Sequence, residues 1–139
     1  MDLEAFISAP SIESLAMDYV ASKRFTDDKG EPVAWKIKPV TAAENEKIVK
    51  RNTTKYIDND GKRATRVDTA AVSNELMVRC VVEPNLNDET LQNAFHAIGA
   101  EDLLDKMLLP GEKADLLKAV FQVNGIENDM SDKIKTAKN

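Results

Sequence analysis

Two residues of this 139-residue chain have side chains suited to nucleophilic or metal chemistry: Cys80 and His96, each the only one of its type. A catalytic Cys–His pair also needs an orienting group and an oxyanion hole, and no motif in the sequence supplies them. A structural zinc site takes about four soft ligands, and these two are the only ones. We therefore expect no catalysis, no metal and no cofactor, with His96 as a partly exposed helical residue.

The stretch IDNDGKRATRV matches a calcium-binding loop only in part. Aligning Gly61 with the sixth position of an EF-hand loop places Asp58 at the third position and Asp60 at the fifth. The first and twelfth positions then fall on Tyr56 and Val67, although both require carboxylates. The stretch therefore predicts a turn.

Positive charge is concentrated in the middle of the chain. Seven Lys or Arg and two Asp between Lys47 and Arg66 give +5, whereas eight acids and three lysines between Glu83 and Lys118 give −5. The simplest interpretation is two solvated faces; the alternative is a patch that binds another protein or nucleic acid. Nucleic acid is disfavoured because the whole chain is acidic. The candidate basic patch is Lys50, Arg51, Lys55, Lys62, Arg63 and Arg66.

The length and the 42% hydrophobic content fit one domain with a modest core. No apolar run reaches the roughly 18–20 residues of a membrane span. The N-terminus carries acids and not the basic region of a secretory signal. One cysteine cannot form an internal disulfide, which favours a cytosolic protein.

The N-terminal part predicts strands. Residues 1–13 form a flexible lead-in with a short apolar cluster, Leu3, Phe6 and Ile7. Residues 14–38 alternate between apolar and polar on both sides of the turn-forming TDDKGEP, which predicts a β-hairpin. Because an isolated hairpin is marginally stable, its apolar face must pack on something else.

Helices dominate the rest of the chain. Thr41 and Glu44 have capping-box spacing and predict a helix over 41–51. Residues 52–67 predict a polar basic loop, mobile or folded as an irregular hairpin around Gly61. Residues 68–125 predict four short helices, capped by Asp68 or Thr69 and by Asn87, with Glu83-Pro84 and Pro110 as boundaries and Asn124-Gly125 as the stop. Residues 126–139 predict a frayed polar tail.

The expected fold is therefore α+β, with an N-terminal hairpin packed on a C-terminal bundle of short helices. Most apolar residues of the bundle should form its core. Six of them, with others, could also supply an apolar groove for an amphipathic partner helix: Leu103, Leu104, Met107, Leu108, Leu117 and Phe121.

Three stretches in this order carry a family resemblance: DDKGEPVAWKIKPVTAAENE, LMVRCVVEPNLNDETLQ and EDLLDKMLLPGEKADLLKAVFQVNG. The most specific pieces are VVEPNLND-x-x-LQ and KMLLPGE-x-x-x-L. Together, over about residues 14–125, they resemble the XkdN-like family of phage tail assembly chaperones.

This resemblance implies a non-catalytic protein of the host bacterial cytoplasm, encoded by a phage or prophage and absent from the mature virion. It implies that the chain binds the tape measure protein, keeps it soluble and helps recruit tail tube subunits. The alternative is a phage or bacterial adaptor that binds another protein or nucleic acid through the basic segment 47–66.

Overall fold

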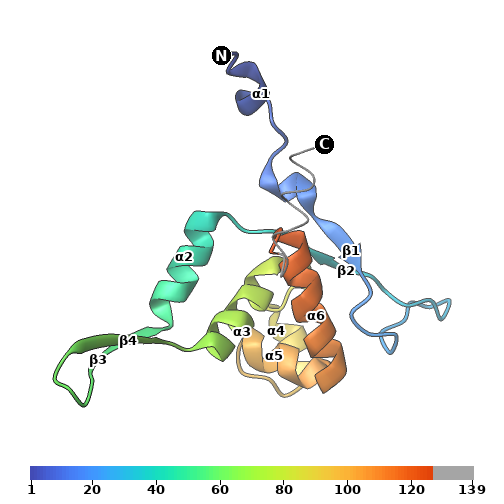
Figure 1. Cartoon of the computed structure of the whole chain (residues 1–139). Coiled ribbons are helices and arrows are strands. Elements are labelled where there is room, and N and C mark those ends of the chain that lie inside the picture. The colour runs from blue at the N-terminus through green and yellow to red at the C-terminus, as the bar shows by residue number, and fades with distance from the viewer. Residues whose placement is uncertain (127–139) are drawn as a thin grey trace.

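The computed structural model describes residues 1–126, which form an α+β fold with a central body and two projections (Figure 1). The α+β class predicted from the sequence is confirmed. In chain order the elements are α1 (Glu4–Ile7), the 3₁₀ helix η1 (Ile12–Leu15), β1 (Met17–Tyr19), β2 (Trp35–Ile37), α2 (Ala42–Arg51), β3 (Thr53–Ile57), β4 (Arg63–Val67), α3 (Thr69–Cys80), β5 (Val81–Glu83), α4 (Glu89–Ala94), α5 (Ala100–Met107) and α6 (Pro110–Val123).

A three-stranded antiparallel sheet of order β1-β2-β5 lies beside the helices. β1 pairs with β2 so that Met17 faces Ile37 and Tyr19 faces Trp35. Trp35 and Ile37 are both buried, because β2 is the central strand and its apolar face lies on the helices. The hairpin thus packs on the bundle. The sequence did not predict β5, which pairs with β2 directly after α3.

Side-chain caps set the helix starts. Thr41 Oγ1 accepts from the Glu44 amide at 3.1 Å, and Asp68 Oδ1 accepts from the Ala71 amide at 3.0 Å. The predicted cap at Asn87 is wrong by one residue: Asp88 caps α4, accepting from the Leu91 amide at 2.9 Å. Pro110 opens α6 as predicted, and Gly125 follows α6 with a φ of 70°.

The core joins the sheet to helices α2, α3, α5 and α6. It includes Trp35 and Ile37 from β2, Ile48 from α2, and the buried stripe of α3. α3 is the central helix because α2, α5 and α6 all contact it. The short links between helices therefore produce mutual packing, as expected for antiparallel neighbours.

Two projections stand off this body (Figure 1). One is the β3–β4 hairpin, called the arm here (residues 53–67), which extends from the ends of α2 and α3. The other is the N-terminal segment that carries α1, none of whose residues is buried. The predicted polar tail, 126–139, lies outside the described residues apart from Ile126.

Candidate partner-binding surfaces

The apolar groove predicted from the bundle is not an accessible surface. Leu103 and Leu104 are 0% and 1% exposed, and Met107 and Leu108 are also buried. Leu117 and Phe121 are partly buried and pack against the same core. The four residues from Leu103 to Leu108 therefore line no accessible groove, because α5 packs its leucine stripe on α3, whereas a role of Leu117 and Phe121 in partner binding stays a prediction.

The predicted basic patch is divided between α2 and the arm. Arg51 is bound to the body, because its Nε donates to Glu75 Oε2 on α3 at 3.0 Å. This bond raises the pKa of Arg51 and lowers the pKa of Glu75. Lys50 is exposed on α2, and the other four cations, Lys55, Lys62, Arg63 and Arg66, are exposed on the arm.

The arm is a regular antiparallel ribbon that turns at Gly61, where the sequence left open a mobile polar loop or an irregular hairpin for residues 52–67. Five residue pairs run from Thr53–Val67 at the base to Ile57–Arg63 at the tip. The Asp58 carboxylate accepts from the amides of Asp60 and Lys62 at 2.9 and 2.8 Å, and Gly61 takes a φ of 77°. The partial match to a calcium loop is thus the turn of a hairpin, with Asp58 already used by backbone amides.

Several bonds fix the base of the arm to the helix pair. The Asp68 amide donates to the Asn52 carbonyl at 2.9 Å, which closes the ribbon at its root. Asn52 Nδ2 donates to Glu75 Oε1 at 3.2 Å, and Thr53 Oγ1 donates to the Val49 carbonyl at 2.7 Å. The arm therefore leaves the body in a direction set by α2 and α3.

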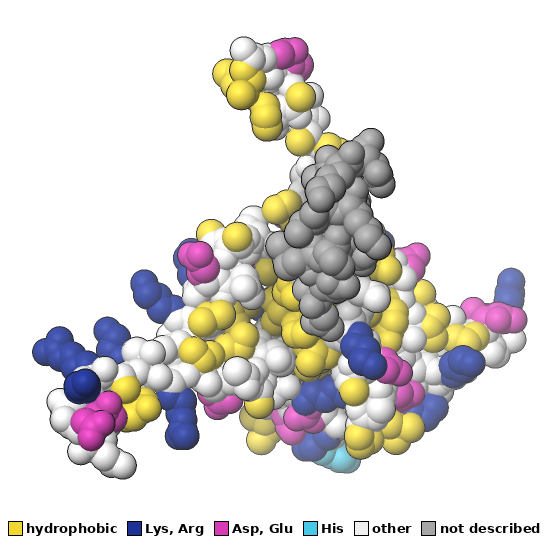
Figure 2. Space-filling model, in the orientation of Figure 1, with side chains coloured by type: hydrophobic (Ala, Val, Ile, Leu, Met, Phe, Trp, Pro, Cys, Tyr) yellow, Lys and Arg dark blue, Asp and Glu magenta, His cyan; other side chains and the backbone are white. Residues whose placement is uncertain are grey.

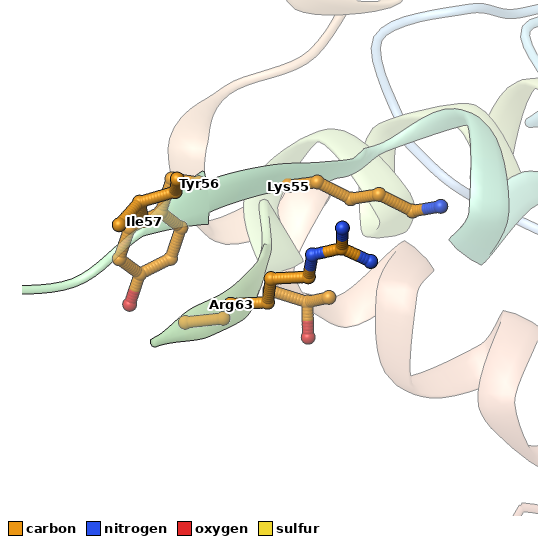
Figure 3. A pocket seen from close by; sticks show the side chains of 6 residues that line it. Lys55, Tyr56, Ile57 and Arg63 are labelled. Carbon is orange, nitrogen blue, oxygen red and sulfur yellow. The ribbon is translucent and has the colours of Figure 1, made fainter. Parts of the chain in front are cut away.

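A shallow hollow of about 420 Å³ lies on the arm. Its lining is Lys55, Tyr56, Ile57, Arg63, Ala64 and Thr65 (Figure 3). The side chains of Lys55 and Arg63 extend in the same direction in this view, with Tyr56 and Ile57 toward the other end of β3. Tyr56 is 48% exposed and Ile57 is 70% exposed, so aliphatic and aromatic surface lies next to positive charge.

The N-terminal projection presents a second apolar cluster, defined as Leu3, Phe6 and Ile7. Their exposed fractions are 60%, 69% and 74%. Figure 2 shows hydrophobic side chains gathered on this projection, away from the body. The spacing of three and four residues places them on one side of the α1 turn. The sequence indicated the cluster but gave no reason to expect that it stays uncovered.

The two residues with potential for chemistry are not brought together. Cys80 is fully buried and its Sγ accepts from Asn124 Nδ2 at 3.4 Å. Burial raises the pKa of the thiol, which disfavours the reactive thiolate. His96 is exposed in the turn after α4, with a φ of 53°, rather than within a helix as predicted. Within residues 1–126 no group of three or more His, Cys, Asp or Glu side chains is arranged to hold a metal.

Carboxylates of the body serve structure. Glu112 accepts from the Leu109 amide at 2.8 Å and pairs with Arg24 at 3.1 Å. The Ser22 hydroxyl, this amide and Arg24 lower the pKa of Glu112. The Ile98 amide and Lys106 likewise lower the pKa of Asp102.

In the part of the chain described, no helix is both long enough and apolar enough to cross a membrane.

The sequence is similar to two proteins of Bacillus subtilis over nearly its whole length. The chain is 28% identical over 140 residues to the phage-like element PBSX protein XkdN of Bacillus subtilis (strain 168), covering 99% of this chain and 94% of that protein. It is 29% identical over 140 residues to the uncharacterized protein YqbN of the same strain, covering 99% and 93%.

The crystal structure of the protein YqbN has the same fold. It superposes with a TM-score of 0.74 at 22% identity, covering 91% of this chain and 98% of that chain. The sequence profile described as phage XkdN-like tail assembly chaperone protein matches residues 3–138, nearly the whole chain. This chain therefore belongs to the XkdN-like family of phage tail assembly chaperones.

Proposed function

We propose that this chaperone binds the tape measure protein, keeps it soluble and helps recruit tail tube subunits. The observation that carries the proposal is the pair of projections with uncovered apolar side chains. Leu3, Phe6 and Ile7 on one projection and Tyr56 and Ile57 on the other are all at least 48% exposed. Exposed apolar clusters rimmed by polar residues favour protein–protein contacts.

The body supports this role by staying closed. Its leucine stripes are buried, so partner binding need not open the core. A small domain with apolar side chains on two separate projections can contact a long apolar polypeptide at two points, which raises its effective affinity. We further propose that it acts in the cytoplasm of the host bacterium and is absent from the finished virion.

Co-expression tests the proposal. The tape measure protein from the same gene cluster should be recovered in the soluble fraction, and should co-purify, only when this chain is present. The triple variant Leu3→Ser, Phe6→Ser, Ile7→Ser should lower the soluble yield, because it removes the apolar cluster without touching the core.

The matched control is Ile98→Ser, which removes an apolar side chain that is 91% exposed on the body. It should leave the soluble yield unchanged. The proposal fails if wild-type protein neither solubilises nor co-purifies the tape measure protein.

A second candidate is an adaptor that binds nucleic acid through the basic segment 47–66. The exposed cations of the arm favour it, since a two-stranded ribbon can enter the major groove of DNA. Salt-sensitive binding to duplex DNA, lost when Lys50, Arg51, Lys62, Arg63 and Arg66 are neutralised, would support the adaptor in place of the chaperone.

A further inference from the structure

The arm is an ordered element with almost no core of its own. Its residues on β3 and β4 are exposed on both faces of the ribbon, apart from partial burial of Thr53 and Ala64. Fixing each residue costs about 1–2 kcal/mol of backbone entropy, and a lone two-stranded hairpin is marginally stable in water. The hydrogen bonds at the root and the turn therefore keep the ribbon ordered while its side chains stay exposed. Burying these side chains against a partner would stabilise the arm further.

Two cations on this surface lie close together, and no ion pair to either is found within residues 1–126. Lys55 faces Thr65 and Ile57 faces Arg63, so Lys55 and Arg63 are diagonal neighbours on one face. The ion pairs within residues 1–126 join α2 to α3, the 22–25 segment to α6, and α5 to itself or to α6, and none includes an arm residue. Adjacent like charges are mutually destabilising, and a bound anion removes this repulsion.

The same face is also apolar. Ile57 is 70% exposed and Val67 is 40% exposed, on the face that carries the two cations. The phosphate backbone of a nucleic acid would neutralise the cations but would leave these apolar side chains exposed to water. Stacking two arms on this face would bring Lys55 and Arg63 of both copies together and add to the repulsion. An acidic polypeptide segment with an apolar residue among its carboxylates fits both properties at once.

We propose that the arm is the docking site for such an acidic segment of the partner, with carboxylates held by Lys55 and Arg63 and an apolar side chain placed on Ile57. Carboxylates two residues apart in an extended segment are about 6.6–6.8 Å apart, close to the roughly 7–8 Å between diagonal neighbours across two strands. Among the described residues, β3 and β4 pair only with each other, so their outer edges offer backbone partners to the same segment. This proposal rests on the proposed function in taking the tape measure protein as the partner.

The test measures binding of the full-length chain to short overlapping peptides that cover the tape measure and tail tube proteins. Wild-type protein should bind acidic peptides of the tape measure protein, more weakly as NaCl is raised. The double variant Lys55→Glu, Arg63→Glu should lower affinity by at least about tenfold, and Ile57→Ser should lower it as well. Lys55→Arg with Arg63→Lys keeps both charges and should retain most of the binding.

The matched control is Lys23→Glu with Lys29→Glu, the same change in net charge at two exposed lysines outside the arm. It should leave the affinity unchanged. Circular dichroism and thermal unfolding of each variant establish that the body is folded.

The outcomes separate the two proposals. If wild-type protein and the arm variants bind tape measure peptides equally, the arm proposal is overturned and the proposed function stands. If arm-dependent binding occurs only with acidic peptides of the tube protein, the tape measure assignment is overturned and the arm site stands. Arm-dependent binding to duplex DNA in place of peptides overturns the arm proposal, and so does the absence of any peptide binding, whereas the proposed function is decided by the co-expression test.

Discussion

At the scale of single residues, Asn124 holds three parts of the body together. Its Oδ1 accepts from the Val40 amide at 2.9 Å, ahead of α2. Its Nδ2 donates to the Val120 carbonyl at 2.8 Å and to the Cys80 sulfur at 3.4 Å, at the end of α3. The sequence predicted Asn124 only as part of a helix stop, because a helix signal is local and Val40 lies 84 positions away.

Replacing Asn124 with Ala should lower the free energy of unfolding by about 1–3 kcal/mol, because the partly buried backbone amide of Val40 loses its acceptor. The exposed neighbour Gln122→Ala is the control and should change it by less than about 0.5 kcal/mol. Urea unfolding followed by circular dichroism measures both. Equal effects for the two variants would contradict the role assigned to Asn124.

The leucines of α5 lead to a second prediction at this scale. Leu103→Ala removes a fully buried side chain and should cost about 2–5 kcal/mol of stability. Leu109, 55% exposed just before α6, should cost less than about 0.5 kcal/mol when changed to Ala. Thermal unfolding distinguishes them. A small effect at Leu103 would return it to the list of candidate surface residues.

At the scale of elements, the predictable parts were those with local signals. Thr41, Asp68 and Pro110 start helices where capping and proline rules place them. β5 was missed because its buried residue, Val81, continues the apolar stripe of α3 four positions after Met77, and only pairing with β2 makes this segment a strand. The arm was missed as a regular ribbon because neither β3 nor β4 has an alternating apolar face, so the usual period of two is absent.

The arm should be removable without unfolding the body. Joining Thr53 to Val67 through Asn-Gly, a two-residue hairpin turn, keeps the first residue pair and the bond between Asp68 and Asn52. The free energy of unfolding should change by less than about 1 kcal/mol, since the deleted residues bury almost nothing. A collapse of the thermal transition would show that the arm supports the fold.

At the scale of the whole molecule, charge is organised as contacts between segments. Arg51–Glu75 and Arg79–Glu44 join α2 to α3, and Arg24–Glu112 joins the sheet side to α6. The sequence showed a basic middle and an acidic second half but not these partners. The acidic half is partly neutralised within the body, whereas the cations of the arm remain exposed.

This organisation predicts loss of stability in acid. The pKa values of Glu75, Asp102 and Glu112 are lowered in the folded protein. Their contribution is therefore fully present above the ordinary carboxyl values and is lost as pH falls through the lowered ones. The melting temperature should be flat from pH 7 to about pH 5 and fall below that.

Glu75→Gln should make that acid decline shallower and should lower stability at neutral pH, because Arg51 and Asn52 lose a carboxylate partner. Glu46→Gln, at an exposed position of α2, is the control and should keep the wild-type profile. Stability that rises on acidification would contradict the sign of these shifts.

The root of the arm has a consequence for how such proteins diversify. Because the ribbon enters and leaves through neighbouring residues, Asn52 and Asp68, its sequence and its length in residue pairs are independent of the body. If the arm docks the partner as proposed, transplanting the ribbon of one relative onto the body of another should transfer partner preference and leave the folding of the recipient intact.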